Sequence, residues 1–172
     1  NLWAGWRNQD RGIQQLLLDP LWTVDYATGE IISGMAAGLP VYNDDFTQMT
    51  INLREGCTWS DGVPVTADDV IFTIDIHINT QGLLYHGPMV QYVEKVSKTD
   101  DLTVVVDLKI PNSRFHTHFL DRWGCLRIMP KHIFENVEDQ LTYEYNPPVG
   151  NGPYVLFDYD PAGFWTLWER RE

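Results

Sequence analysis

Three carboxylates lie close together in the segment CTWSDGVPVTADDV, residues 57–70. Asp61, Asp68 and Asp69 fall within nine consecutive positions. Carboxylates at this spacing can serve as a general acid/base pair or as ligands of a metal ion. They can also mark a turn and the start of a helix, because an aspartate side chain accepts hydrogen bonds from nearby backbone N–H groups.

The elements that must position these carboxylates favour the second role. Ser60-Asp61-Gly62 is typical of a turn in which Gly62 adopts a positive φ. Thr66 suits the N-cap of a helix over residues 67–79, where Asp69 takes the N3 position of a capping box. The apolar face predicted for this helix spans about 100° and consists of Ala67, Val70, Ile71, Ile74 and Ile78. Asp68 and Asp69 lie off this face and point apart, so we predict a turn and a cap without catalytic function.

Three histidines form the other group that could bind a metal. His116 and His118 would share one face of a strand, but they diverge on a helix. Residues 113–123, SRFHTHFLDRW, favour a helix capped by Ser113, and His132 follows a separate helix start at Pro130. No cysteine or carboxylate lies at zinc-like spacing. Nucleophile-elbow, phosphate-loop and Cys-x-x-Cys motifs are also lacking. We therefore predict no metal, no cofactor and no catalytic residues.

Composition narrows the classes of partner. The 172 residues include 12 Lys and Arg against 24 Asp and Glu, a net charge of −12. Nucleic-acid binding needs clustered basic residues that neutralise phosphates, so we exclude it. No apolar run approaches the roughly 18–20 residues of a transmembrane helix. Cys57 and Cys125 allow one disulfide, although two separate buried thiols are the prediction.

The remaining pattern mixes helices with local hairpins. A helix is expected over residues 10–22, capped by Asp10 and ended at Asp19-Pro20. Alternation predicts a strand at 49–53 and a hairpin at about 91–111, after a Gly/His/Pro loop at 81–88. A short strand is expected before Pro130, and a second hairpin joins strands at about 153–159 and 163–169. This order predicts an α/β or α+β fold, with a mixed sheet, hairpins and short helices.

Three co-linear motifs carry a family resemblance. INLREGCTWSDGVPVTADDVIFTID (51–75) resembles the signature segment of the extracellular solute-binding proteins of ABC importers, the oligopeptide/dipeptide-binding family, family 5. IMPKHIFENV (128–137) is similar to that family's Pro-Lys-His helix start. PPVGNGPYVLFDYDPAGFWTLWER (147–170) is similar to its Gly-x-Gly-Pro-Tyr segment and the following strand pair.

The resemblance implies a periplasmic-binding-protein-like fold with two lobes that close on a ligand. Family members are several times longer, so the chain would be an N-terminal part of lobe one. Residues of about 40–145 would form an inserted subdomain, and 1–39 with 146–172 a portion of the core sheet. The opening NLWAGWRNQD lacks the features of a signal sequence, and the end follows directly on a strand. We therefore expect a chain that is incomplete at both ends.

The resemblance also implies a function and a site. It implies a non-catalytic receptor, periplasmic or at the cell surface (secreted or lipid-anchored), that passes oligopeptides to permease subunits. An oligosaccharide receptor, or a module that only docks on the permease, are the alternatives. The implied ligand contacts are Trp3, Trp6, Arg7 and Asn151, although both Trp side chains could equally pack beneath a loop. A structural role falls to Asp61, Gly62, Thr66, Asp69, Gly152, Pro153 and Tyr154. Exposed edges of a truncated lobe predict self-association.

Overall fold

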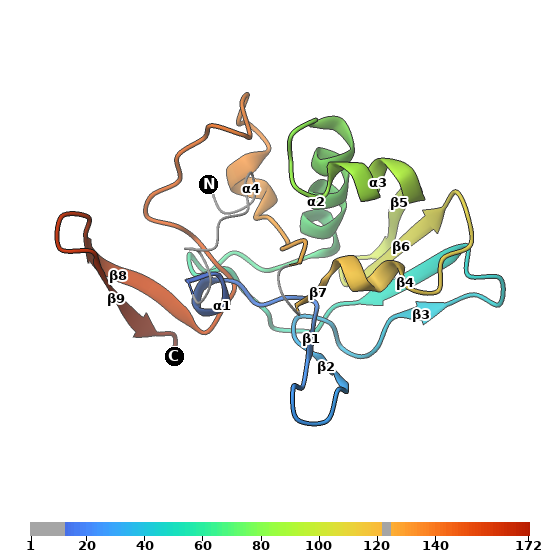
Figure 1. Ribbon diagram of the computed structural model, residues 1–172, viewed down its shortest axis with the longest axis horizontal. Helices are drawn as coiled ribbons and strands as arrows, with labels where there is room; N and C mark the ends of the chain where they lie inside the picture. Colours follow the sequence, from blue (N-terminus) through green and yellow to red (C-terminus); the bar gives the residue numbers. More distant parts are fainter. Residues whose placement is uncertain (1–12, 122–124) are drawn as a thin grey trace.

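The computed structural model describes residues 13–121 and 125–172 and has a mixed α/β fold, as predicted (Figure 1). The helices are α1 (Ile13–Leu17), α2 (Ala67–Asn79), α3 (His86–Tyr92), the 3-10 helix η2 (Phe115–His118) and α4 (Lys131–Phe134). The strands are β1 (Trp22–Val24), β2 (Ile31–Ser33), β3 (Val41–Tyr42), β4 (Gln48–Asn52), β5 (Val93–Asp100), β6 (Thr103–Leu108), β7 (Leu120–Asp121), β8 (Tyr154–Asp160) and β9 (Trp165–Arg170).

A four-stranded antiparallel sheet, in the order β3-β4-β6-β5, carries much of the core. Alternate residues of β4 and β6 point to one face, so Met49 and Ile51 are buried beside Val104 and Val106. Helix α2 packs against β5 and β6. The alternation predicted within each of these two strands is therefore confirmed, while their pairing with one another was not predicted. Strand β5 lies at one edge of this sheet. It carries charged residues along its length, which discourages pairing with another chain.

A second sheet, in the order β2-β1-β7, joins distant parts of the chain. β1 pairs with β2 in an antiparallel hairpin and with β7 in parallel, where Trp22 is opposite Leu120. This pairing overturns the helix predicted for residues 113–123. Asn112 Oδ1 accepts the Arg114 N–H at 2.9 Å, so the chain turns there, and between residues 113 and 121 only the four residues of η2 become helical. Leu120 and Asp121, which follow η2, then pair with β1 as strand β7.

Two further expectations differ from the structure. The predicted loop at 81–88 contains the start of α3, where Pro88 falls in the first turn and therefore costs no helical hydrogen bond. The strand expected before Pro130 is absent, although residues 125–130 are all buried. The backbone there bonds elsewhere, since the Met129 N–H donates to Thr73 Oγ1 at 2.8 Å. Pro130 is the N-cap of α4, in agreement with the predicted helix start.

The last two strands form a hairpin that extends away from the sheets (Figure 1, left). Its bounds confirm the predicted strand pair, and the Asp160 carboxylate accepts the Ala162 N–H at 2.8 Å in the predicted turn. Several large apolar side chains of the hairpin are exposed: Phe157, Tyr159, Phe164, Trp165 and Leu167. A two-stranded hairpin with both edges open has little stability of its own, so its attachment to the body matters.

One buried apolar cluster connects α1, the central sheet, α2 and α4. The proposed division at about residues 40 and 145 therefore stays a prediction. Helix α1 ends at Leu17, just before the predicted end at Asp19-Pro20, and the predicted cap, Asp10, lies outside the described residues. Cys57 and Cys125 are both free thiols, and burial raises the pKa of Cys125 to about 12. Within residues 13–121 and 125–172, no helix has the length and apolar character needed to cross a bilayer.

Candidate binding site

The N-terminus of α2 is built by a turn and a cap. The Asp61 carboxylate accepts the Val63 N–H at 3.2 Å, and Gly62 has a φ of 89°, a conformation that favours glycine. Thr66 is the extended N-cap residue of a capping box with Asp69. Helix α2 begins and ends at the predicted residues, because the turn, the cap and the apolar face all agree.

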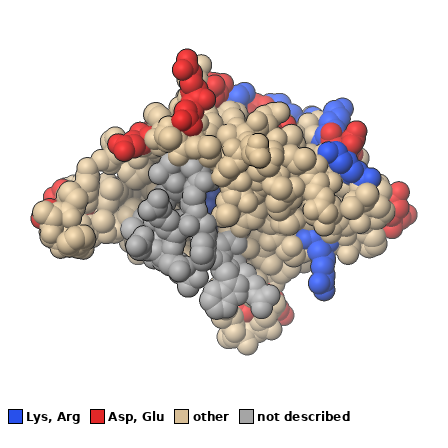
Figure 2. Space-filling model, turned by 45° about the horizontal axis from the view of Figure 1, so that its top comes forward, with Lys and Arg blue, Asp and Glu red and all other residues tan. Residues whose placement is uncertain are grey.

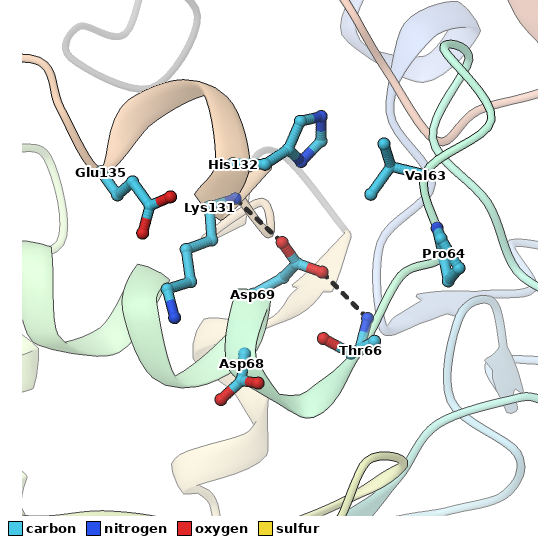
Figure 3. Close-up of a pocket in the computed structure, with 8 residues that line it drawn as sticks. All are labelled: Val63, Pro64, Thr66, Asp68, Asp69, Lys131, His132 and Glu135. Atoms are coloured by element: carbon cyan, nitrogen blue, oxygen red, sulfur yellow. Dashed lines mark hydrogen bonds between the residues drawn. The ribbon is translucent and has the colours of Figure 1, made fainter.

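Asp69 is more buried than the sequence indicated. Its side chain was expected off the buried face of the helix, but the residue is only 4% exposed, because Trp59 and the start of α4 cover it. The carboxylate accepts backbone N–H groups of Thr66 (2.9 Å) and Lys131 (2.8 Å), as Figure 3 shows, and the Trp59 indole at 3.4 Å. Burial raises the pKa of Asp69, against these hydrogen bonds. Asp69 therefore ties the cap of α2 to α4.

The buried face of α2 is also rotated from the prediction. Thr73 and His77 are buried, whereas Ile71 and Ile78 are only half-buried. The Thr73 hydroxyl donates to the Asp69 carbonyl at 2.7 Å and His77 Nδ1 lies 2.7 Å from the Thr73 carbonyl. Hydrogen bonds along the helix thus satisfy these polar groups, which allows burial that a count of apolar residues does not predict.

A pocket of about 290 Å³ lies between the N-terminus of α2 and α4 (Figure 3). It is lined by Val63, Pro64, Thr66, Asp68, Asp69, Lys131, His132 and Glu135. Beside it, His132 Nε2 lies 2.8 Å from Asp61 Oδ2. Burial alone would raise the pKa of Asp61. The hydrogen bonds from His132 and from the Val63 N–H together have a larger effect, so the pKa lies below its ordinary value. No pattern in the sequence indicates this pair, because 71 positions separate the two residues.

The three carboxylates of the segment have separate partners. Asp61 contacts His132, Asp69 accepts the bonds of the cap, and Asp68 pairs with Lys98 Nζ at 2.8 Å. A His–carboxylate pair can orient an imidazole for catalysis, but it needs a nucleophile in hydrogen-bond reach of the other ring nitrogen. Among the described residues, no group of three or more His, Cys, Asp and Glu side chains is arranged to hold a metal ion. The arrangement joins a turn to a helix.

The Gly150-Asn151-Gly152 loop packs directly on helix α1. Gly152 donates its N–H to the Leu17 carbonyl at 2.7 Å, and Gly150 accepts the Ser60 N–H at 2.8 Å. A Cβ on Gly152 would lie 2.5 Å from the Leu17 carbonyl carbon, and one on Gly150 would lie 2.1 Å from the Leu17 carbonyl oxygen. Only glycine permits this approach. The exposed Pro153 and the half-exposed Tyr154 then lead the chain into β8.

Asn151, a predicted ligand contact, is held by structural hydrogen bonds. Its Oδ1 accepts the Asp19 N–H at 3.2 Å, and its Nδ2 donates to the Asp19 carbonyl at 3.2 Å and to Met35 Sδ. Both amide hydrogens are thereby used, while Oδ1 keeps one acceptor position. Nearby, burial raises the pKa of Asp19, an effect that Arg127, Arg54 and Arg171 oppose. The other three predicted ligand contacts, Trp3, Trp6 and Arg7, lie outside the described residues. All four contacts, Asn151 included, therefore stay predictions.

Arg171 attaches the hairpin to the body of the chain, a role that no pattern in the sequence indicated. Its guanidinium donates to the carbonyls of Gly152 (3.2 Å), Thr58 (3.0 Å) and Trp59 (3.1 Å), and to the Thr58 hydroxyl at 2.9 Å. Its backbone N–H also donates to the Pro153 carbonyl at 2.9 Å. The Gly-Asn-Gly loop, the turn before α2 and the end of β9 therefore meet at one side chain.

Relatives of known structure share this arrangement of elements. CtaP, an ABC transporter substrate-binding protein from Listeria monocytogenes, has a TM-score of 0.81 and 30% identity, over 97% of this chain and 33% of its own. A periplasmic oligopeptide-binding protein of an ABC transporter from Thermotoga maritima, solved with mannohexaose, has a TM-score of 0.75 and 29% identity. That likeness covers 84% of this chain and 26% of the Thermotoga chain.

Sequence comparison places the chain in the same group. The oligopeptide-binding protein AppA of Bacillus subtilis is 32% identical over 121 residues, 68% of this chain and 22% of AppA. The chain thus spans about a fifth of the length of the curated relatives it matches. Residues 30–172 match the family described as bacterial extracellular solute-binding proteins, family 5, middle. The chain therefore belongs to family 5 of the bacterial extracellular solute-binding proteins.

Proposed function

We propose that this chain is part of lobe one of the extracytoplasmic substrate-binding component of an ABC importer. The receptor would capture oligopeptides and deliver them to permease subunits. The match of residues 30–172 to the solute-binding family carries this proposal. The 32% identity to the oligopeptide-binding protein AppA supports a peptide as the ligand. Its location would be periplasmic or at the cell surface, and its role would be to bind without catalysis.

An oligosaccharide is the second candidate ligand. The Thermotoga oligopeptide-binding protein was solved with mannohexaose bound, at 29% identity to this chain. Aromatic side chains stack on sugar faces and on peptide side chains alike, so Trp3 and Trp6 suit both ligands. Asn151 could contribute its remaining Oδ1 acceptor position, which would bond a ligand N–H or hydroxyl. Arg7 would favour a carboxylate.

Retained ligand distinguishes these candidates. The full-length protein, incubated with mixed peptide and oligosaccharide libraries and washed, is expected to release intact oligopeptides in native mass spectrometry. Trp6→Ala should weaken retention about tenfold or more if this side chain is a central contact. Release of oligosaccharides alone would establish the second candidate. Release of cleaved products, or of nothing, would contradict the proposed receptor function.

The chain alone should bind the same ligand weakly. Pockets bury about 70–90% of a ligand only when they are enclosed. A two-lobed receptor encloses its ligand between both lobes, so one lobe leaves much of the ligand in water. Calorimetry of residues 1–172 is therefore expected to show little heat with a peptide that the full-length protein retains. Equal affinity of both proteins would place the whole site within this chain.

We also propose that the chain alone self-associates through the β8–β9 hairpin. Phe164 is 94% exposed and Phe157 is 66% exposed, on a two-stranded sheet with open edges. Light scattering should show a concentration-dependent dimer that Phe157→Ser and Phe164→Ser together abolish. Tyr26→Ser, which removes an aromatic ring that is 75% exposed in the turn between β1 and β2, is the matched control and should leave the dimer intact. A wild-type monomer at high concentration would refute this proposal.

A further inference from the structure

Four of the five histidines of the chain lie in α2, α3 and η2, which the rings of Tyr85 and Tyr92 connect. His77 of α2 is only 1% exposed, and its Nδ1 bonds the Thr73 carbonyl. Its ring lies 6.5 Å from that of Tyr85, and its own carbonyl lies 2.9 Å from His86 Nδ1. The bond to Thr73 requires a hydrogen on Nδ1, so the neutral ring carries its lone pair on Nε2.

His118 of η2 is surrounded by aromatic rings. The centroid of its ring lies 5.5 Å from Phe115, 6.0 Å from Tyr92 and 6.4 Å from Tyr85. These rings belong to η2, to α3 and to the residue before α3, so His118 fills the space between these elements. A charged imidazole in this position would lose much of its hydration, because the surrounding surface is largely apolar.

His116 of η2 contacts Tyr42 of β3 through both its backbone and its ring. The Tyr42 hydroxyl accepts the His116 backbone N–H at 2.9 Å and lies 3.0 Å from His116 Nδ1. The hydroxyl can donate its hydrogen to an unprotonated Nδ1, whereas a protonated Nδ1 makes the hydroxyl oxygen the acceptor of both bonds. A proton on Nδ1 would therefore reverse this hydrogen bond between β3 and η2. The edge of the Trp22 ring also packs near His116, with centroids 6.4 Å apart.

The charged groups around these rings do not favour a cation. Arg114 opposes a positive charge on His116, and His86 opposes one on His77. Asp121, Arg127 and the Cys125 thiol face Tyr85, but Asp121 is already paired with Arg127 at 2.6 Å. Burial lowers the pKa of His77 to about 4 and also lowers the pKa of His116 and of His118. Among the described residues, none of these groups offers an unpaired carboxylate to a protonated ring.

We propose that His77, His116 and His118, with Tyr42, Tyr85 and Tyr92, form an acid-sensitive latch between η2 and its neighbours. The neutral rings hold η2 against α3 and β3. Protonation charges the rings where no described residue offers an unpaired carboxylate, and it reverses the hydrogen bond between His116 Nδ1 and the Tyr42 hydroxyl, so the latch opens. The chain, which carries the proposed ligand-receiving lobe, would therefore loosen in acid. The latch itself does not depend on the ligand or on the receptor function.

The direction in which stability changes with pH follows from the histidines of the unfolded chain. There they take up protons near their ordinary pKa of 6.5, whereas the folded rings resist protonation. Stability is therefore complete above about pH 6.5 and falls as the pH decreases toward the folded values. The upper part of this interval, between about pH 6.5 and about pH 5, lies above the ordinary pKa of 3.8 for aspartate, although burial raises the pKa of Asp19 and of Asp69 toward it.

Urea unfolding of the full chain at pH 7 and at about pH 5 tests the latch. The wild-type midpoint should fall at the lower pH, and His118→Phe, which keeps a ring of similar shape, should remove part of that fall. His116→Asn should remove a further part. His132→Gln is the matched control, since this residue lies in the Asp61 contact outside the latch, and the acid-induced fall should persist. An unchanged fall in both latch variants would overturn the proposal.

Ring resonances provide a test that needs no variant. In an NMR titration of the wild-type chain, the carbon-bound ring protons of His77, His116 and His118 should titrate below 6.5. At the same pH values, amides of η2 and α3 should lose protection from hydrogen exchange before amides of β4 and β6. Titration of the three rings at or above 6.5, or simultaneous loss of protection in all elements, would exclude the latch.

Discussion

Gly152→Ala is expected to destabilise the chain by about 3 kcal/mol, in the upper range for overpacking of a close-packed site. The new Cβ would lie 2.5–2.7 Å from the backbone of Leu16 and Leu17, both in α1. Backbone atoms cannot rotate away as a side chain can, so either the loop or α1 must move. Movement would also break the bond from the Gly152 N–H to the Leu17 carbonyl. Urea unfolding monitored by circular dichroism measures the loss.

Gly38→Ala is the matched control for this substitution. No heavy atom lies within 4 Å of a Cβ built on Gly38, so the same methyl group should change stability by no more than about 0.5 kcal/mol. A Gly152→Ala midpoint equal to that of the wild type would show that α1 does not rest on this loop in solution.

Asp69→Ala is expected to cost about 3 kcal/mol, because it removes the acceptor of several buried donors at once. The Thr66 and Lys131 backbone N–H groups and the Trp59 indole would lose their partner, in a position that is only 4% exposed. Asp69→Asn keeps the volume but turns one acceptor into a donor that faces a backbone N–H. Its loss should be smaller than that of alanine and still measurable in urea.

Thr66→Ala separates the cap from the tie to α4. It alters the same capping box at the same helix end but leaves the Lys131 bond in place, and should cost about 1 kcal/mol. If Asp69→Ala cost no more than Thr66→Ala, the carboxylate would contribute only as a cap, and the contact with α4 would add nothing to stability.

The local elements that could be predicted were those whose signals agree. Helix α2 has a turn, a cap and an apolar face in sequence, and its bounds are as predicted. The hairpins β5–β6 and β8–β9 have turn residues between two strand-like segments, and β6 also alternates buried with half-buried residues. By contrast, residues 113–123 have a helical composition, yet Leu120 and Asp121 pair with β1, about 98 positions away. Long-range pairing of this kind overrides local propensity and leaves no periodic signal in the segment itself.

The site shows the same limit. The sequence identified Asp61 and Asp69 as turn and cap, but their second partners, His132 and the Lys131 N–H, come from a helix far along the chain. Asn151 was identified through its motif, while Asp19 and Met35, which hold its amide, lie more than 100 positions before it. Side-chain contacts between distant segments depend on the packed fold, and no spacing within one segment encodes them.

The four hydrogen bonds of the Arg171 guanidinium give the hairpin a mechanical role. A force applied along β9 reaches Thr58 and Trp59 directly through the guanidinium, and the Trp59 indole passes it to Asp69 at the start of α2. The hairpin is thus an exposed arm that is anchored at its base by one planar cation, which resists movement in the plane of its hydrogen bonds. Strain imposed on the exposed arm would therefore reach the N-terminus of α2 as well as α1, on which the Gly152 loop rests.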